Sequence, residues 1–187
     1  PENILTPGVE VTTGPLGQGF AYGVGMGIAS NHLAAVFNRR GFPVVDNYIY
    51  CICSDGDLME GVSSEAQSIA GHLKLDNLVW IYDDNTITIE GHTELAFSED
   101  VARRFEGYGW NALRVDDAND LAAIQRATDA AKNVTDRASI IVLKSVIGYG
   151  APNKANTHGA HGAPLGPEEV KLAKQNYGWP GDAQFLA

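Results

Sequence analysis

The chain has 187 residues, of which 44% are hydrophobic and 19% are charged, a balance typical of soluble globular proteins. Its net charge of −10 argues against a surface that binds nucleic acid, although a metal ion and a few backbone amides can still bind phosphate locally. We expect neither a membrane span nor a signal peptide, and therefore a cytoplasmic location. The length is that of one domain with a sizeable core.

The N-terminal part is expected to be a loop that leads into a glycine-rich helix. Residues 1–13 form the loop, and Thr13 to Gly17 form a turn that opens a helix over residues 18–38. Each glycine costs a helix about 1 kcal/mol relative to alanine at exposed interior positions. Their number predicts that this helix packs closely against a sheet or against another helix.

Two apolar segments, residues 48–53 and 78–82, do not alternate with polar residues. They predict strands covered on both faces, as in a parallel sheet. Residues 63–75, between them, predict a helix. A strand–helix–strand unit places both strand ends at one edge of the sheet, where open α/β folds bind ligands. The fold class is therefore α/β, with a mostly parallel sheet flanked by helices.

The two cysteines, Cys51 and Cys53, lie on the first predicted strand. At this spacing they point to the same face but lie too far apart to form a disulfide. We expect buried, reduced thiols, which suit a cytosolic protein. A zinc site would need more ligands than this pair offers.

Asp55 and Asn85 follow the two strands and lie 30 positions apart. A carboxylate, an amide oxygen and a main-chain carbonyl are hard oxygen ligands that Mg²⁺ takes together with substrate phosphates. Gly56 permits close approach of the backbone, and a helix that begins a few residues later favours an anion. These residues are consistent with a magnesium-bridged diphosphate. The more common alternative for the same residues is an aspartate that caps a helix and an asparagine in a turn.

The remaining elements alternate between helix and strand. A helix begins with residues 98–101 and stops at Gly109, a strand covers residues 110–115, an amphipathic helix covers 120–133 and a strand covers 139–146. Residues 147–166 are glycine-rich and lack periodicity, so they predict a functional or mobile loop. That loop carries His158 and His161, without the acids or cysteines of a metal site. A last helix runs from Pro167 to near Gly178.

The order Asp55-Gly56, then Asn85 after an apolar strand, resembles the thiamine-diphosphate motif, with Ser54 in place of the family's usual first glycine. Four further segments resemble transketolases in particular. They are TTGPLGQG at residues 12–19, DLMEG at 57–61, YDDN at 82–85 and HGAPLG at 161–166. The resemblance covers nearly the whole chain.

The resemblance implies a thiamine-diphosphate-binding fold over residues 1–187, incomplete at its N-terminus and without the pyrimidine-binding and C-terminal domains of the family. It implies that Mg²⁺, or Ca²⁺ or Mn²⁺ in its place, binds Asp55, Asn85 and the main-chain carbonyl of Ile87. It also implies catalytic roles for His161, between the cofactor phosphate and the substrate, and for Glu60, in a carboxylate network at a dimer interface. The implied cofactor-binding residues are Gly14, Pro15, Leu16, Gly56, Asn85 and His161.

The implied activity is transfer of a two-carbon ketol unit from a ketose phosphate to an aldose phosphate, as in the pentose phosphate pathway. The implied partners are sugar phosphates and either a second copy or a complement with the pyrimidine-binding domain, whose glutamate activates the cofactor. We expect no nucleic acid or membrane partner and, for this chain alone, no turnover. Two alternatives stay open: a dihydroxyacetone synthase, whose motifs overlap, and a non-catalytic interaction module that retains the fold.

Overall fold

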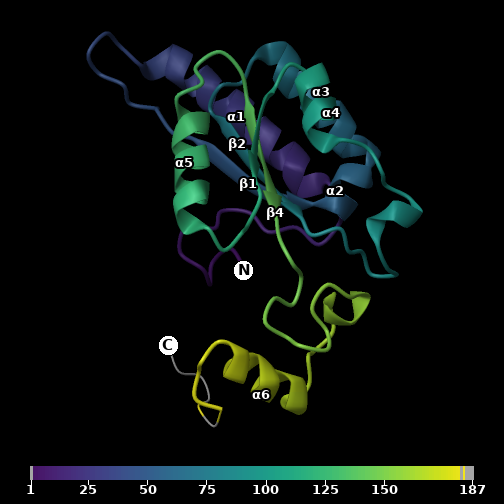
Figure 1. Cartoon of the computed structure of the whole chain (residues 1–187). Coiled ribbons are helices and arrows are strands. Elements are labelled where there is room, and N and C mark those ends of the chain that lie inside the picture. The colour runs from purple at the N-terminus through teal and green to yellow at the C-terminus, as the bar shows by residue number, and fades with distance from the viewer. Residues whose placement is uncertain (1, 182, 184–187) are drawn as a thin grey trace. The chain divides into compact units, whose positions relative to one another are not determined.

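A computed structural model describes residues 2–181 and residue 183. Contacts within the chain group these residues into two compact units. The first unit comprises residues up to 84 together with residues 99–144 and contains the sheet (Figure 1). The second comprises residues 85–98 and the residues from 145 onward. The prediction of a single domain stays a prediction.

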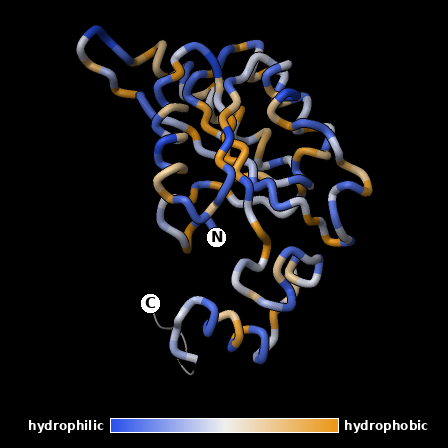
Figure 2. Tube along the Cα trace, viewed as in Figure 1, coloured by the Kyte–Doolittle hydropathy of each residue, from blue (hydrophilic) through white to orange (hydrophobic). Residues whose placement is uncertain are grey.

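The strands of the first unit form one parallel sheet in the order β1-β2-β4-β3. These strands are β1 (Ile49–Ser54), β2 (Leu78–Asp84), β3 (Asn111–Val115) and β4 (Ser139–Lys144). The apolar segments at β2 and β4 run through the middle of the unit (Figure 2). The predicted fold class, a parallel sheet flanked by helices, is confirmed.

Helix α5 (Leu121–Lys132) covers one face of the sheet, where it packs on β2, β3 and β4 (Figure 1). The centre of this layer is a buried cluster of Val79, Val115, Ala131 and Ile141. Asp120 caps the helix, because its side chain accepts a hydrogen bond from the backbone N–H of Ala123. The amphipathic helix predicted for residues 120–133 is thus present as α5, with its apolar side on the sheet.

The opposite face carries α1 (Gln18–Phe37), α3 (Gly61–Leu73) and α4 (Val101–Gly107). Its core is aromatic: Trp80 packs against the rings of Phe20 and Trp110, whose centroids lie 6.2 Å from each other. The glycines of α1 allow the close approach that their number predicts. A Cβ atom on Gly23 would lie 2.9 Å from the Trp80 ring, and one on Gly27 would lie 2.5 Å from Leu78 Cδ2.

Strand β1 corrects one prediction, because its side chains are not covered on both faces. It lies at the edge of the sheet, and the side chains that it directs toward the α5 face are 50% exposed at Tyr50 and 77% exposed at Ile52. Helix α5 lies over the other strands. Cys53 is buried as expected, whereas Cys51 is only partly buried, and both thiols are free.

The second unit contains two short 3₁₀ helices, η1 (Thr93–Leu95) and η2 (His158–Ala160), and helix α6 (Pro167–Asn176). The glycine-rich segment before α6 is anchored to that helix by Glu169. The Glu169 carboxylate accepts hydrogen bonds from the backbone N–H groups of Asn153 (2.7 Å) and Lys154 (3.1 Å). A segment without sequence periodicity is therefore held by specific polar contacts.

Among the described residues, none of the helices combines the length and the apolar character needed to cross a membrane.

Candidate functional site

Asp55 lies where β1 ends, and it is the first residue of the short helix α2 (Asp55–Met59). Only 2% of Asp55 is exposed. The phenolic hydroxyl of Tyr82, on the neighbouring strand β2, donates a hydrogen bond to Asp55 Oδ1. Burial and this hydrogen bond raise the pKa of the Tyr82 phenol above its ordinary value. The strand pairing thus presents a buried, oriented carboxylate at the carboxyl end of the sheet.

A short helix, α2, begins at Asp55 itself, which the sequence did not predict, and the predicted helix follows a few residues later as α3, from Gly61. The residue that caps α2 is Ser54, and Asp57 Oδ2 accepts a hydrogen bond from the backbone N–H of Ser54 (3.0 Å). Ser-x-x-Asp is a variant of the capping-box pattern, in which the third helical residue reaches back to the residue before the helix. Because Ser54 and Asp57 form this capping box and Asp55 is the first helical residue, Asp55 is not the cap of α2.

Asp57 also contacts the predicted cofactor loop, which our sequence reasoning missed. Its Oδ1 accepts a hydrogen bond from the backbone N–H of Gly17 (2.8 Å). Gly17 has a left-handed backbone with φ of 75° and directly precedes α1. The acid three residues after Ser54 was a visible signal for the cap. The contact with Gly17 joins positions 40 apart and had no local signal.

The structure brings together two of the predicted cofactor residues, Leu16 and Gly56. A Cβ atom on Gly56 would lie 3.2 Å from Leu16 Cδ1, which is tighter than ordinary van der Waals contact. Gly14 and Pro15 are exposed on the same loop as Leu16. Absence of a side chain at Gly56 therefore lets this loop approach the strand end closely, as a backbone cradle for a ligand requires.

Glu60 lies at the junction between α2 and α3, where it is the residue before α3. Its side chain is exposed. A Cβ atom on Gly17 would lie 2.8 Å from Glu60 Cβ and 2.8 Å from Ser63 Oγ, so the loop packs against this junction. The role of Glu60 in a network between subunits stays a prediction.

Asn85 follows the last residue of β2 directly and begins the second unit. Its Oδ1 accepts a hydrogen bond from the backbone N–H of Ile87 (2.9 Å), across Thr86, whose φ is 62°. Ile87 also forms an isolated antiparallel bridge with His92. The structure therefore brings together Asn85 and Ile87, the two predicted metal ligands of this segment, in one tight turn.

His161 follows the 3₁₀ helix η2 in the second unit, and its backbone N–H donates to His158 O (2.9 Å). His161 is partly buried, whereas His158 is exposed. The predicted site residues are thus divided between the units. Gly14, Pro15, Leu16, Asp55, Gly56 and Glu60 belong to the first unit, and Asn85, Ile87 and His161 belong to the second. Their assembly into one site stays a prediction.

The described residues contain no group of three or more His, Cys, Asp and Glu side chains that could hold a metal ion. The predicted ligand set would not produce such a group, because Asp55 is its only member of these types. The other two donors are the Asn85 amide oxygen and a backbone carbonyl. One carboxylate with neutral oxygen donors suits Mg²⁺, which usually completes its octahedron with water and substrate phosphate.

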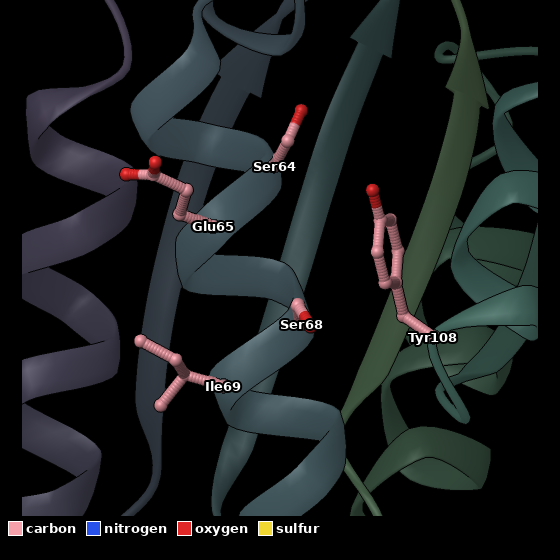
Figure 3. A pocket seen from close by; sticks show the side chains of 5 residues that line it. All are labelled: Ser64, Glu65, Ser68, Ile69 and Tyr108. Carbon is pink, nitrogen blue, oxygen red and sulfur yellow. The ribbon is translucent and has the colours of Figure 1, made fainter.

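A separate hollow lies on the surface between α3 and Tyr108 (Figure 3). Ser64 and Ser68 project from α3 toward Tyr108, and Glu65 and Ile69 lie on the other side of the helix (Figure 3). The Ser64 hydroxyl already accepts a hydrogen bond from Arg104 Nη2 (2.6 Å). The predicted site residues do not line this hollow.

The sheet and the residues at its strand ends define an α/β domain of the class that binds a ligand at the carboxyl ends of parallel strands. The model of the family "Transketolase, thiamine diphosphate binding domain" matches residues 1–187. The chain belongs to this family.

Curated relatives and solved structures agree with this assignment. The chain is 56% identical to the transketolase of Geobacillus stearothermophilus over 179 residues and 57% identical to that of a Nostoc species over 183 residues. A structure of transketolase from Leishmania mexicana matches with a TM-score of 0.95 at 44% identity and covers 100% of this chain and 28% of its own. The matched residues make up 96% and 97% of this chain but only 27% of the length of each of these two curated relatives.

Proposed function

We propose that this chain is the cofactor-binding part of a transketolase, which transfers a two-carbon ketol unit from a ketose phosphate to an aldose phosphate through thiamine diphosphate. The observation that carries the proposal is the buried Asp55 carboxylate, oriented by Tyr82 at the strand end and adjoined by the Leu16–Gly56 contact. A structure of transketolase from Pichia stipitis in complex with sedoheptulose 7-phosphate, 48% identical to this chain, supports the substrate class.

In this proposal Asp55, Asn85 and the Ile87 carbonyl would hold Mg²⁺, or Ca²⁺ or Mn²⁺, which would neutralise the diphosphate charge of the cofactor. When bound, thiamine diphosphate supplies a carbon centre that stabilises the carbanion of the two-carbon unit. The protein residues bind and orient. A buried carboxylate attracts a divalent cation more strongly than an exposed one, because the surrounding dielectric is lower.

The remaining proposed roles concern the cofactor surroundings and the substrate. Gly14, Pro15, Leu16 and Gly56 approach the cofactor with backbone and apolar groups. His161 lies beside phosphate or substrate, where an imidazole donates a hydrogen bond or moves a proton. Glu60 faces a second subunit.

We also propose the partners and the location. The partners are sugar phosphates and a second copy or a complement with the pyrimidine-binding domain. The location is the cytoplasm, which the free thiols of Cys51 and Cys53 support because reduced cysteines persist there.

Calorimetric titration of the purified chain with thiamine diphosphate, with and without Mg²⁺, tests the cofactor role. We expect binding that requires Mg²⁺ and is lost with EDTA. Asp55→Asn should weaken it by about a hundredfold, because the amide offers the cation one neutral oxygen in place of a carboxylate. Asp46→Asn, at an exposed position, is the matched control and should bind like the wild type. Binding without Mg²⁺, or equal affinity in both variants, would contradict the proposal.

A second assay tests the need for a complement. The chain alone is mixed with xylulose 5-phosphate, ribose 5-phosphate, thiamine diphosphate and Mg²⁺, and product formation is followed. We expect no turnover, because the proposed complement supplies the glutamate that activates the cofactor. Clear turnover by the chain alone would contradict that part of the proposal.

A further inference from the structure

We infer that Asp57 is a positioning residue that sets the loop of residues 14–17 and the strand-end segment of residues 54–56 in one geometry for the cofactor. The inference rests on the proposed function, since both segments carry residues proposed to bind the cofactor or its metal. Asp57 itself is assigned no contact with either. It acts through the backbone groups that it holds.

Each oxygen of the Asp57 carboxylate accepts a hydrogen bond from one of the two segments. Oδ1 accepts from the Gly17 N–H at 2.8 Å, and Oδ2 accepts from the Ser54 N–H at 3.0 Å. Hydrogen bonds to an ionised acceptor are roughly twice as strong as neutral ones. One side chain therefore fixes the distance between two backbone segments that lie far apart in the sequence.

The residues next to this bridge are those proposed to bind the cofactor. Leu16 precedes Gly17, and Gly56 precedes Asp57. The Leu16 side chain lies against Gly56, so the bridge and the apolar contact stand side by side. Any shift of Gly17 away from Asp57 would open the Leu16–Gly56 contact and displace Asp55 relative to the loop.

Asp57 is itself held in place. Its backbone carbonyl accepts a hydrogen bond from the Ser63 hydroxyl (2.5 Å), which belongs to α3. Gly17 packs against the same serine, because a Cβ atom at Gly17 would lie 2.8 Å from Ser63 Oγ. A residue that served only as a cap for α2 would need the Ser54 contact alone. The contact with Gly17 is the feature that a capping role leaves unexplained.

The test measures thiamine diphosphate affinity in the presence of Mg²⁺ for Asp57→Ala and Asp57→Asn. We expect Asp57→Ala to raise Kd about tenfold, which corresponds to about 1.4 kcal/mol. Asp57→Asn should give a smaller increase, because its amide keeps one acceptor oxygen and loses the other. Asp120→Ala is the matched control, since it also removes an aspartate that accepts a backbone N–H at a helix start, but the helix concerned is α5. It should lower thermal stability and leave Kd unchanged.

Amide hydrogen exchange followed by NMR supplies a readout that needs no cofactor. In the wild type, the Gly17 and Ser54 amides should be protected, and in Asp57→Asn at least one of them should exchange about tenfold faster. In Asp120→Ala both should keep wild-type rates. An unprotected Gly17 amide in the wild type would overturn the inference directly.

Different results would contradict the proposed function and the positioning role of Asp57. Absence of Mg²⁺-dependent binding in the wild type overturns the proposed function. Wild-type binding together with an unchanged Kd in Asp57→Ala overturns the positioning role alone. If Asp57→Ala does not fold, as judged by circular dichroism, the milder Asp57→Asn decides by the same comparison of Kd.

Discussion

The hydroxyl of Tyr82 donates a hydrogen bond to the carboxylate of Asp55 and thereby connects β2 to the first residue of α2. Tyr82 is 3% exposed and Asp55 is 2% exposed, so the contact lies inside the first unit. A buried carboxylate is costly unless it accepts hydrogen bonds. The pairing of β1 with β2 is what brings the two side chains, 27 positions apart, together.

Replacement of Tyr82 by phenylalanine should destabilise the protein even without any metal or cofactor. The change removes the donor and leaves the ring in place, so we expect a loss of about 1.5–3 kcal/mol in the free energy of unfolding. Urea denaturation in metal-free buffer measures it. Tyr50→Phe, on the exposed edge strand, is the control and should change this free energy by no more than about 0.5 kcal/mol. Identical midpoints for Tyr82→Phe and wild type would show that the hydrogen bond does not stabilise the fold.

The glycines of α1 should respond to alanine in opposite directions. At Gly23 a Cβ atom would lie 2.9 Å from the buried Trp80 ring, so Gly23→Ala should lower the free energy of unfolding by about 1–3 kcal/mol through overpacking. At Gly25 a Cβ atom would meet nothing within 4 Å, so Gly25→Ala should raise that free energy by up to about 1 kcal/mol. Chemical denaturation of both variants tests this, and a stabilising Gly23→Ala would contradict the observed packing.

Glu169 should make the second unit sensitive to acid. Hydrogen bonds from the Asn153 side chain and from the Asn153 and Lys154 backbone lower the pKa of its carboxyl. The stabilisation is therefore fully present above the unfolded glutamate pKa, about 4.3, and is lost as the pH falls through the lower folded pKa. We therefore expect the hydrogen-exchange protection factors of the Asn153 and Lys154 amides to decrease as the pH is lowered below about 4.3.

A matched pair of variants checks that origin. Glu169→Gln should show low protection of the two amides already at pH 6, since a neutral amide side chain replaces the charged acceptor. Glu168→Gln, at the exposed neighbouring position, should keep the wild-type profile. Protection that is insensitive to Glu169→Gln would mean that other contacts hold the loop.

The two thiols should be unreactive in the folded protein. Burial raises the pKa of Cys51 to about 12 and raises that of Cys53 above its ordinary value. The reactive thiolate is therefore scarce at pH 8. Mass spectrometry after iodoacetamide treatment should find slow labelling of the native chain and rapid double labelling in urea. Rapid labelling of the native protein at Cys53 would contradict the burial of that side chain.

Local signals in the sequence predicted most of the secondary structure. The uninterrupted apolar segments became β1 and β2. The helices predicted to begin at residues 98–101 and at residue 120 became α4 and α5, which the structure caps with Asp100 and Asp120. The exposure of Ile52 had no local signal, since it follows from the reach of α5 over the finished sheet.

The candidate site shows the same division between local and distant information. The spacing of Asp55 from Asn85 pointed to the strand ends, because strand and helix lengths fix where a βαβ unit brings its loops. The hydrogen bond between Gly17 and Asp57 depends on how α1 docks on the sheet, and no spacing rule encodes it. The assignment of Asp55, Asn85 and Ile87 as metal ligands stays a prediction, because Asp55 belongs to the first unit whereas Asn85 and Ile87 belong to the second.

The position of β4 between β2 and β3, both of which precede it in the chain, has a consequence for synthesis on the ribosome. β1 and β2 can pair as soon as residue 84 has emerged. β3 pairs with β4 in the sheet, so residues 111–115 cannot join the sheet until residues 139–144 have been synthesised. Until then the apolar edge of β2 is open to chaperones and to other nascent chains, because partly folded α/β domains expose such surfaces. Completion of the sheet is therefore tied to the arrival of its fourth strand.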